Sequence, residues 1–93
     1  MGRLDGKVTV ITGGAGVIGT AAGKLFVEEG SKVLLVDLDK SNLEKVVQSI
    51  GSDAVSYAVA DVSQPEQVQG YVNMAVERYG SIDVFLNNAG IEG

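Results

Sequence analysis

Glycines that follow an apolar segment are the first residues of this chain with a recognisable chemical use. Gly14, Gly16 and Gly19 match the pattern Gly-x-Gly-x-x-Gly, directly after the β-branched segment 7–12. Without side chains, a backbone can approach a pyrophosphate closely, and a helix that begins here offers unpaired N–H groups and a positive dipole end. The alternative is a loop whose glycines merely turn the chain. The position between a strand and a helix favours a phosphate-binding loop.

An acid follows at the distance that this pattern requires. Asp37 ends the apolar segment 32–37, about 20 residues beyond the last glycine, where an acid can bind the hydroxyls of an adenosine ribose. The same carboxylate would repel the 2′-phosphate of NADP, and Lys40 is the only cation nearby in the sequence. A solvated acid at a strand end is the alternative. NAD is therefore favoured over NADP.

Two further polar sites follow predicted strands. Asp61 comes after the segment 54–60, and Asn88 comes after the segment 82–86. The carboxyl ends of parallel strands form the edge at which such sheets bind ligands. Taken alone, Asp61 could be a turn or cap residue, and Asn87 and Asn88 could be turn formers.

The elements that must position these residues alternate along the chain. Four apolar segments predict strands, namely 7–12, 32–37, 54–60 and 82–86. Three amphipathic segments between them predict helices that end at Gly30, Gly51 and Gly80. This alternation predicts an α/β fold, the N-terminal half of a Rossmann-type doubly wound parallel sheet with strand order 3-2-1-4.

Finer features of these elements can be predicted as well. Ile18, Ala21, Ala22, Leu25 and Phe26 have helical spacing and predict the buried stripe of the first helix. The segments 41–44 and 63–66 read Ser-Asn-Leu-Glu and Ser-Gln-Pro-Glu, which predicts capping boxes at the starts of the second and third helices. In the third strand, the alternation of Val55, Tyr57 and Val59 with small residues predicts one bulky face.

Composition excludes several classes of function. The chain has 93 residues, a net charge of −5, no cysteine and no histidine. Disulfides, thiolate nucleophiles, zinc clusters and histidine acid–base chemistry are therefore excluded within it. The negative charge argues against nucleic acid or an anionic membrane as partner. With neither a long apolar segment nor a signal peptide in the sequence, a cytoplasmic location is expected.

Three blocks together resemble the short-chain dehydrogenase/reductase family, and the likeness covers the whole chain. The segment 12–19 reads Thr-Gly-Gly-Ala-Gly-Val-Ile-Gly, 61–63 reads Asp-Val-Ser, and 87–90 reads Asn-Asn-Ala-Gly. The resemblance implies that the first block holds the pyrophosphate, Asp37 selects NAD, the second block contacts adenine, and the third lines the ribose side. The implied cofactor-binding residues are Gly13, Gly16, Val17, Ile18, Gly19, Asp37, Leu38, Asp61, Val62, Asn88, Ala89 and Gly90.

Val17 departs from the family's common short form, which has glycine at this position. The glycine spacing is instead similar to that of the extended branch of sugar-nucleotide epimerases and dehydratases, while the other two blocks favour the short form. An extended-branch enzyme is therefore kept as an alternative.

The resemblance also implies that catalysis needs residues outside this chain. In the family, a Tyr-x-x-x-Lys pair, a serine and an asparagine lie beyond the Asn-Asn-Ala-Gly block. The tyrosines here fit core stripes and none has lysine four residues later, so no catalytic residue is assigned. We expect the chain to be the cofactor-binding part, residues 1–93, of a longer single-domain enzyme.

For that enzyme the resemblance implies an NAD-dependent oxidoreductase that interconverts a secondary alcohol and a ketone, or acts on a 3-oxoacyl thioester. It also implies a homotetramer or homodimer. A non-catalytic dinucleotide-binding module is the alternative from another class of function.

Overall fold

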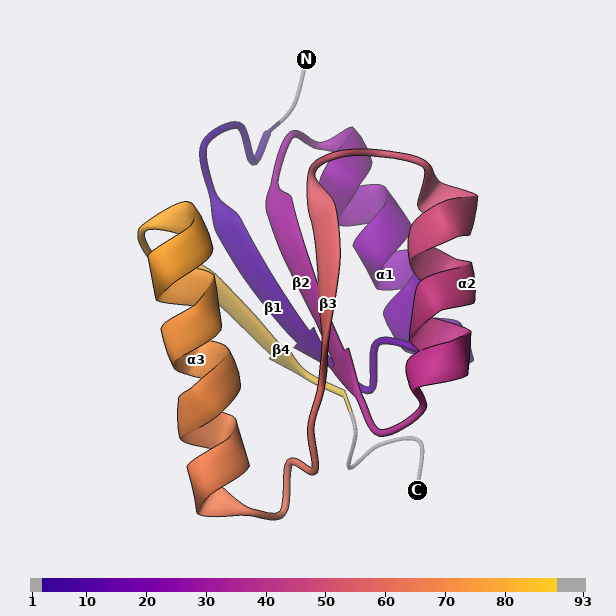
Figure 1. Cartoon of the computed structure of the whole chain (residues 1–93). Coiled ribbons are helices and arrows are strands. Elements are labelled where there is room, and N and C mark those ends of the chain that lie inside the picture. Colours follow the sequence, from indigo (N-terminus) through magenta and orange to yellow (C-terminus); the bar gives the residue numbers. More distant parts are fainter. Residues whose placement is uncertain (1–2, 89–93) are drawn as a thin grey trace.

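Strands and helices alternate through the computed structural model, which describes residues 3–88 (Figure 1). The elements are β1 (Val8–Thr12), α1 (Val17–Glu28), β2 (Lys32–Asp37), α2 (Lys40–Ile50), β3 (Val55–Val59), α3 (Pro65–Tyr79) and β4 (Val84–Asn87). All three strand pairings are parallel, and the order across the sheet is β3-β2-β1-β4. The predicted fold and strand order are confirmed. β2 has the predicted bounds, and the other strands differ from the predicted ones by one or two residues at an end.

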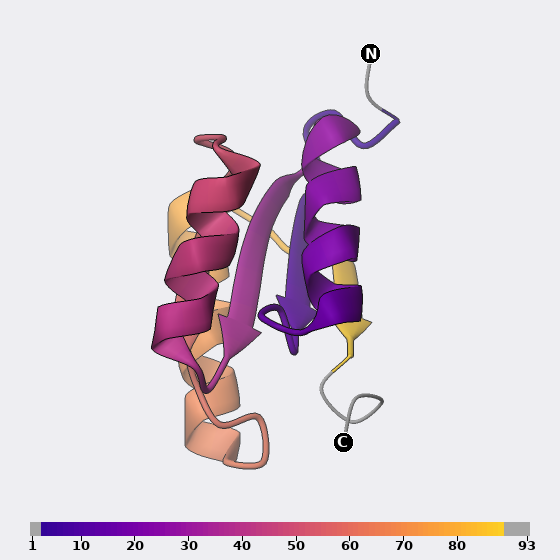
Figure 2. The same ribbon diagram turned by 90° about the vertical axis from the view of Figure 1, so that its right-hand side faces the viewer.

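The sheet lies between two helical layers, with α1 and α2 on one face and α3 on the other (Figures 1 and 2). Neighbouring residues of the central strands point to opposite faces. Val10 and Leu34 pack in the core beneath α3, whereas Ile11 and Leu35 pack in the core beneath α1 and α2. Because both faces are covered, β1 and β2 consist almost entirely of buried residues, as their apolar sequences predict.

Helix α1 packs on the sheet through glycines, and the predicted stripe is wrong in part. The side chains of Ile18 and Leu25 are each 52% exposed, whereas Gly19 and Gly23 are buried. A Cβ added to Gly23 would lie 3.0 Å from Leu35 Cδ2, so a side chain there would require the Leu35 side chain to shift. Of the predicted stripe, Ala22 and Phe26 do join the core.

Both predicted capping boxes are wrong. Helix α2 begins earlier, at Lys40, because Asp39 caps it: its Oδ1 accepts a hydrogen bond of 3.0 Å from the backbone N–H of Asn42. Ser41 therefore lies within the helix. Gln64 precedes Pro65 at the start of α3 and makes no side-chain capping bond. The Ser63 hydroxyl instead donates a hydrogen bond to Asp61.

The outer strand β3 places its bulky and its small residues on opposite faces. Val55 and Tyr57 pack on the core beneath α1 and α2, whereas Ala58 and Ala60 pack on the core beneath α3. Val59, at the end of the strand, is exposed. In the part of the chain described, every helix is too short or too polar to cross a membrane.

Candidate functional site

The carboxyl ends of the four strands lie at one edge of the sheet. Because all strands are parallel, their carboxyl ends meet there, at the ends of the arrows in Figure 1. The glycine-rich segment follows β1, Asp37 ends β2, Asp61 follows β3 and Asn88 follows β4. The residues predicted from strand ends are thus assembled on the same edge.

The glycine-rich turn is built so tightly that side chains are excluded from it. Gly13 has φ of 68°, a left-handed conformation that glycine adopts readily, and its carbonyl accepts a 3.1 Å bond from the N–H of Gly16. A Cβ on Gly14 would lie 2.7 Å from the Cβ of Leu35. A Cβ on Gly19 would press on the Gly13 carbonyl oxygen. Close packing between the turn, α1 and β2 therefore accounts for these glycines.

Helix α1 starts at this turn without a side-chain cap. Its N-cap is Gly16, and the first turn of the helix contains no acidic residue. The positive end of the helix dipole is therefore not offset by the protein's own carboxylates in that turn. Val17, at the first helical position, is 87% exposed, so its side chain lies outside the turn and does not crowd it.

Asp37 lies beside the glycine-rich turn and makes several backbone contacts. Its Oδ2 accepts a 3.0 Å hydrogen bond from the N–H of Ala15. Its Oδ1 accepts bonds of 2.7 Å from the N–H of Leu38 and 3.4 Å from that of Asp39. The Leu38 side chain is exposed beside this carboxylate. The acid and the phosphate-loop candidate thus form one unit.

Asp61 is held by the residues that follow it. Its Oδ1 accepts bonds from the Ser63 hydroxyl at 2.7 Å and the Ser63 N–H at 2.9 Å, and these bonds hold the pKa of Asp61 below its ordinary value. The backbone N–H of Asp61 donates to Gln67 Oε1 at 2.6 Å. Val62 is half-buried against the core beneath α3. Asp61 is consequently a fixed, half-buried carboxylate.

Thr12 joins the ends of the two central strands, a role that the sequence did not indicate. Its hydroxyl donates to Asn87 Oδ1 at 3.0 Å and accepts from the backbone N–H of Asn88, also at 3.0 Å. Asn88 is 1% exposed, and its side-chain Nδ2 is a buried donor without a hydrogen-bond acceptor in the part of the chain described. The position of Thr12 at the end of β1 is the only sequence signal for this contact. The predicted site residues Ala89 and Gly90 lie outside the described residues.

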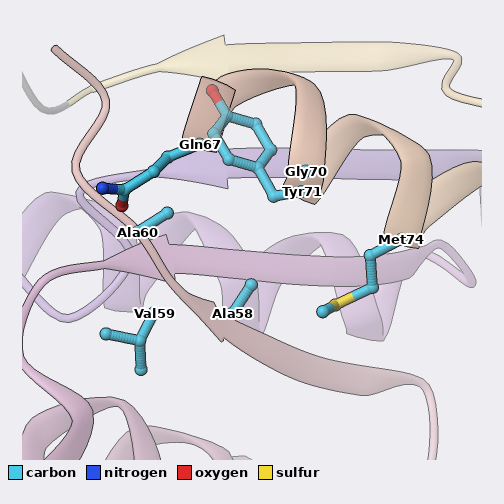
Figure 3. A pocket seen from close by; sticks show the side chains of 7 residues that line it. All are labelled: Ala58, Val59, Ala60, Gln67, Gly70, Tyr71 and Met74. Carbon is cyan, nitrogen blue, oxygen red and sulfur yellow. The ribbon is translucent and has the colours of Figure 1, made fainter. Parts of the chain in front are cut away.

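A surface cavity of about 280 Å³ opens between β3 and α3, and sequence reasoning missed it (Figure 3). It is lined by Ala58, Val59, Ala60, Gln67, Gly70, Tyr71 and Met74. None of these side chains is charged. The cavity contains neither the glycine-rich turn nor Asp37, but it adjoins Asp61, because Ala60 and Gln67 line it and Gln67 bonds to the Asp61 N–H.

These features fit a dinucleotide. The glycine-rich turn is packed so closely against β2 and its own backbone that a Cβ at Gly14 or Gly19 would not fit. It lies at an uncapped helix start suited to a pyrophosphate. Asp37 offers an acceptor for ribose hydroxyls next to that turn. Within residues 3–88, no group of three or more acids gathers as a metal site would require.

The tyrosines have structural roles. The Tyr57 hydroxyl donates to Glu44 Oε2 at 3.0 Å, and this contact raises the pKa of Tyr57. The Tyr79 hydroxyl lies 2.6 Å from Ser56 Oγ. Tyr71 projects from α3 into the core, with its ring centroid 6.2 Å from that of Phe85, and burial raises its pKa. Each of these contacts fits a structural role.

Comparison with known proteins gives a consistent assignment. The family model described as short chain dehydrogenase matches residues 7–93. Short-chain dehydrogenase reductase 3a of Arabidopsis thaliana is 43% identical over 89 residues, which cover 96% of this chain and 35% of that protein. Momilactone A synthase of Oryza sativa is 43% identical over 91 residues, covering 98% of this chain and 33% of that protein.

Solved structures agree with the sequence comparisons. The 3-ketoacyl-(acyl-carrier-protein) reductase of Brucella melitensis complexed with NADH matches with a TM-score of 0.81 and 37% identity, covering 89% of this chain and 34% of that one. Glucose dehydrogenase of Caenorhabditis elegans, in its apo form, matches with a TM-score of 0.87 and 31% identity, covering 97% of this chain and 41% of that one. The chain spans about a third of the length of the curated relatives it matches. By the extent of the family match and its agreement with the fold, the chain belongs to the short-chain dehydrogenase family.

Proposed function

We propose that these residues form the dinucleotide-binding part of an oxidoreductase that uses NAD in preference to NADP. The observation that carries the proposal is the carboxylate of Asp37, which lies within hydrogen-bond distance of the glycine-rich turn. A carboxylate in this position can accept hydrogen bonds from the ribose hydroxyls of NAD, and it repels the additional phosphate of NADP. Bound NAD would supply a hydride acceptor, and the residues described here would bind and orient it.

The reaction proposed for the full protein is interconversion of a secondary alcohol and a ketone, with 3-oxoacyl thioesters as one substrate class. Support comes from the names of similar proteins, which include a 3-ketoacyl-(acyl-carrier-protein) reductase and a glucose dehydrogenase. Acid–base groups for this reaction would come from outside the described residues. Incubation of the full protein with NAD and a panel of secondary alcohols, or with NADH and ketones, tests this proposal through the absorbance of NADH.

Cofactor preference is tested by the ratio of the dissociation constants for NADP and NAD. In the full protein, Asp37→Ala should weaken NAD more than NADP, because NAD loses its hydroxyl acceptor while NADP is relieved of repulsion. The matched control is Asp39→Ser, which removes a neighbouring negative charge while keeping a residue able to cap α2. The control should leave the ratio near that of the unaltered protein. If Asp37→Ala lowered the affinity for both cofactors equally, Asp37 would not be the residue that binds the ribose.

A further inference from the structure

We infer that Asp37 is also a positioning residue for the glycine-rich turn, through the hydrogen bond that its carboxylate accepts from the N–H of Ala15. This inference rests on the proposed dinucleotide site and adds a second role to one of its residues. The ribose role concerns which cofactor binds, whereas the positioning role concerns the pyrophosphate of either cofactor.

The turn has few side-chain contacts that hold its position. Residues 13–16 carry a single side-chain carbon beyond the backbone, the methyl group of Ala15, which packs against the core beneath α1 and α2. Gly13 has positive φ, and glycine is the residue that loses most conformational freedom when it becomes ordered. Beyond this methyl contact and the close packing at Gly14 and Gly19, the location of the segment depends on its hydrogen bonds.

Two consecutive bonds attach the turn to the end of β2. The N–H of Gly14 donates to the carbonyl oxygen of Val36 at 3.0 Å, which continues the spacing of the sheet. The next N–H, of Ala15, donates to Oδ2 of Asp37 at 3.0 Å. The first bond uses backbone atoms only, whereas the second requires a side chain with an acceptor at this position. Asp37 is thus the one side chain of β2 that accepts a hydrogen bond from the turn among the described contacts.

The two oxygens of the Asp37 carboxylate accept hydrogen bonds from different segments. Oδ2 contacts the turn, and Oδ1 contacts the backbone of the segment that leads into α2, at Leu38 and Asp39. An ionised carboxylate has about four lone-pair positions, and the three bonds leave acceptor capacity for a hydroxyl. The same group can therefore hold the turn and bind a ribose at once, and its loss should affect ligands that have no ribose hydroxyl.

A ligand without these hydroxyls separates the two roles. The probe is 2′,3′-dideoxyadenosine 5′-diphosphate. It keeps adenine and pyrophosphate but lacks both ribose hydroxyls that would donate hydrogen bonds to Asp37. In the full protein, Asp37→Ala should weaken this probe by about fivefold to tenfold, the size expected for one hydrogen bond. Asp37→Asn keeps an oxygen that can accept from Ala15 and should retain most of the affinity. Asp39→Ser controls for the loss of a nearby negative charge and should leave binding unchanged or slightly tighter.

A second measurement needs no ligand. The amide hydrogen of Ala15 should exchange with solvent faster in Asp37→Ala than in Asp37→Asn, at equal melting temperature of the two variants. Unchanged exchange together with unchanged or tighter binding of the probe in Asp37→Ala would overturn the positioning role.

The outcomes also separate this inference from the proposed function. If the unaltered protein binds NAD, and Asp37→Ala changes the ratio of NADP to NAD affinity but neither the probe nor Ala15 exchange, the positioning role alone fails. If the unaltered protein binds neither NAD nor NADP, the proposed function fails, and the role in cofactor binding fails with it.

Discussion

Thr12 and Asn88 are joined by a buried hydrogen bond of 3.0 Å, from the backbone N–H of Asn88 to the Thr12 hydroxyl. The hydroxyl in turn donates to Asn87 Oδ1. One side chain thus bonds to an acceptor 75 residues away and to a donor 76 residues away in the sequence. This contact fixes the end of β4 against the end of β1, at the edge of the sheet where the candidate site lies.

Replacement of Thr12 by valine should therefore destabilise the protein although the side chains are similar in shape. The buried N–H of Asn88 would lose its acceptor, which is expected to lower the free energy of unfolding by about 1–3 kcal/mol. Urea denaturation of the full protein measures the loss. Thr12→Ser keeps the hydroxyl and should lose less; a loss from serine as large as that from valine would show that the methyl group matters instead.

Gly19→Ala should damage the site, whereas Gly70→Ala should stabilise the protein. At Gly19 the new methyl group would press on the Gly13 carbonyl oxygen, so the turn must move; the expected cost is about 1–3 kcal/mol, together with weaker binding of ADP. Gly70 lies in α3 with no atom within 4 Å of the added carbon, so alanine there should gain about 0.5–1 kcal/mol. Thermal unfolding and ADP titration of both variants measure these effects. Unchanged ADP binding in Gly19→Ala would contradict the close approach of Gly19 to the Gly13 carbonyl oxygen.

Ser63→Ala should raise the pKa of Asp61 toward its ordinary value of 3.8, because the hydroxyl that favours the carboxylate is removed. In the native protein this pKa is lowered, so the Asp61–Ser63 contact stabilises the fold above the pKa of the unfolded chain. That contribution fades as the pH falls through the native value. An NMR titration of the Asp61 carboxyl carbon measures the change. Ser49→Ala, whose hydroxyl bonds to the Val46 carbonyl within α2, should leave the titration of Asp61 unaltered.

Asp39→Ala should lower the free energy of unfolding by about 1 kcal/mol, the usual cost of losing an N-cap. Ser41→Ala should change it by less than about 0.5 kcal/mol, because Ser41 lies within α2 and does not cap it. Chemical denaturation of the two variants side by side checks both values. A larger loss from Ser41→Ala would mean that the helix starts later than observed.

The architecture was predictable because independent signals agree along the chain. Apolar strands, amphipathic helices and terminal glycines all indicate the same alternation, and parallel pairing then follows from the connections. The same reasoning brought Asp37, Asp61 and Asn88 to one edge of the sheet, since each follows a strand.

The details that failed depend on distances between elements. Periodicity predicted that Ile18 and Leu25 are buried, but the close approach of α1 to β2 turns the glycine face inward. Ser41 fits a capping pattern, yet Asp39 precedes it and takes the N–H of Asn42. Neither the bond between Ala15 and Asp37 nor that between Thr12 and Asn88 leaves a periodic trace in the sequence, because each joins residues that only the fold brings together.

The position of β1 in the sheet has a consequence for synthesis on the ribosome. β1 precedes β2 and β4 in the chain and lies between them, so Thr9 aligns with Val33 on one side and with Val84 on the other. A nascent chain can pair β1 with β2 early, but the second side must wait until nearly all of these residues have emerged. Such distant pairing is slow, because a long loop must close before the contact forms. β1 is thus half-paired until β4 has emerged, a period in which chaperone binding would protect it from joining another chain.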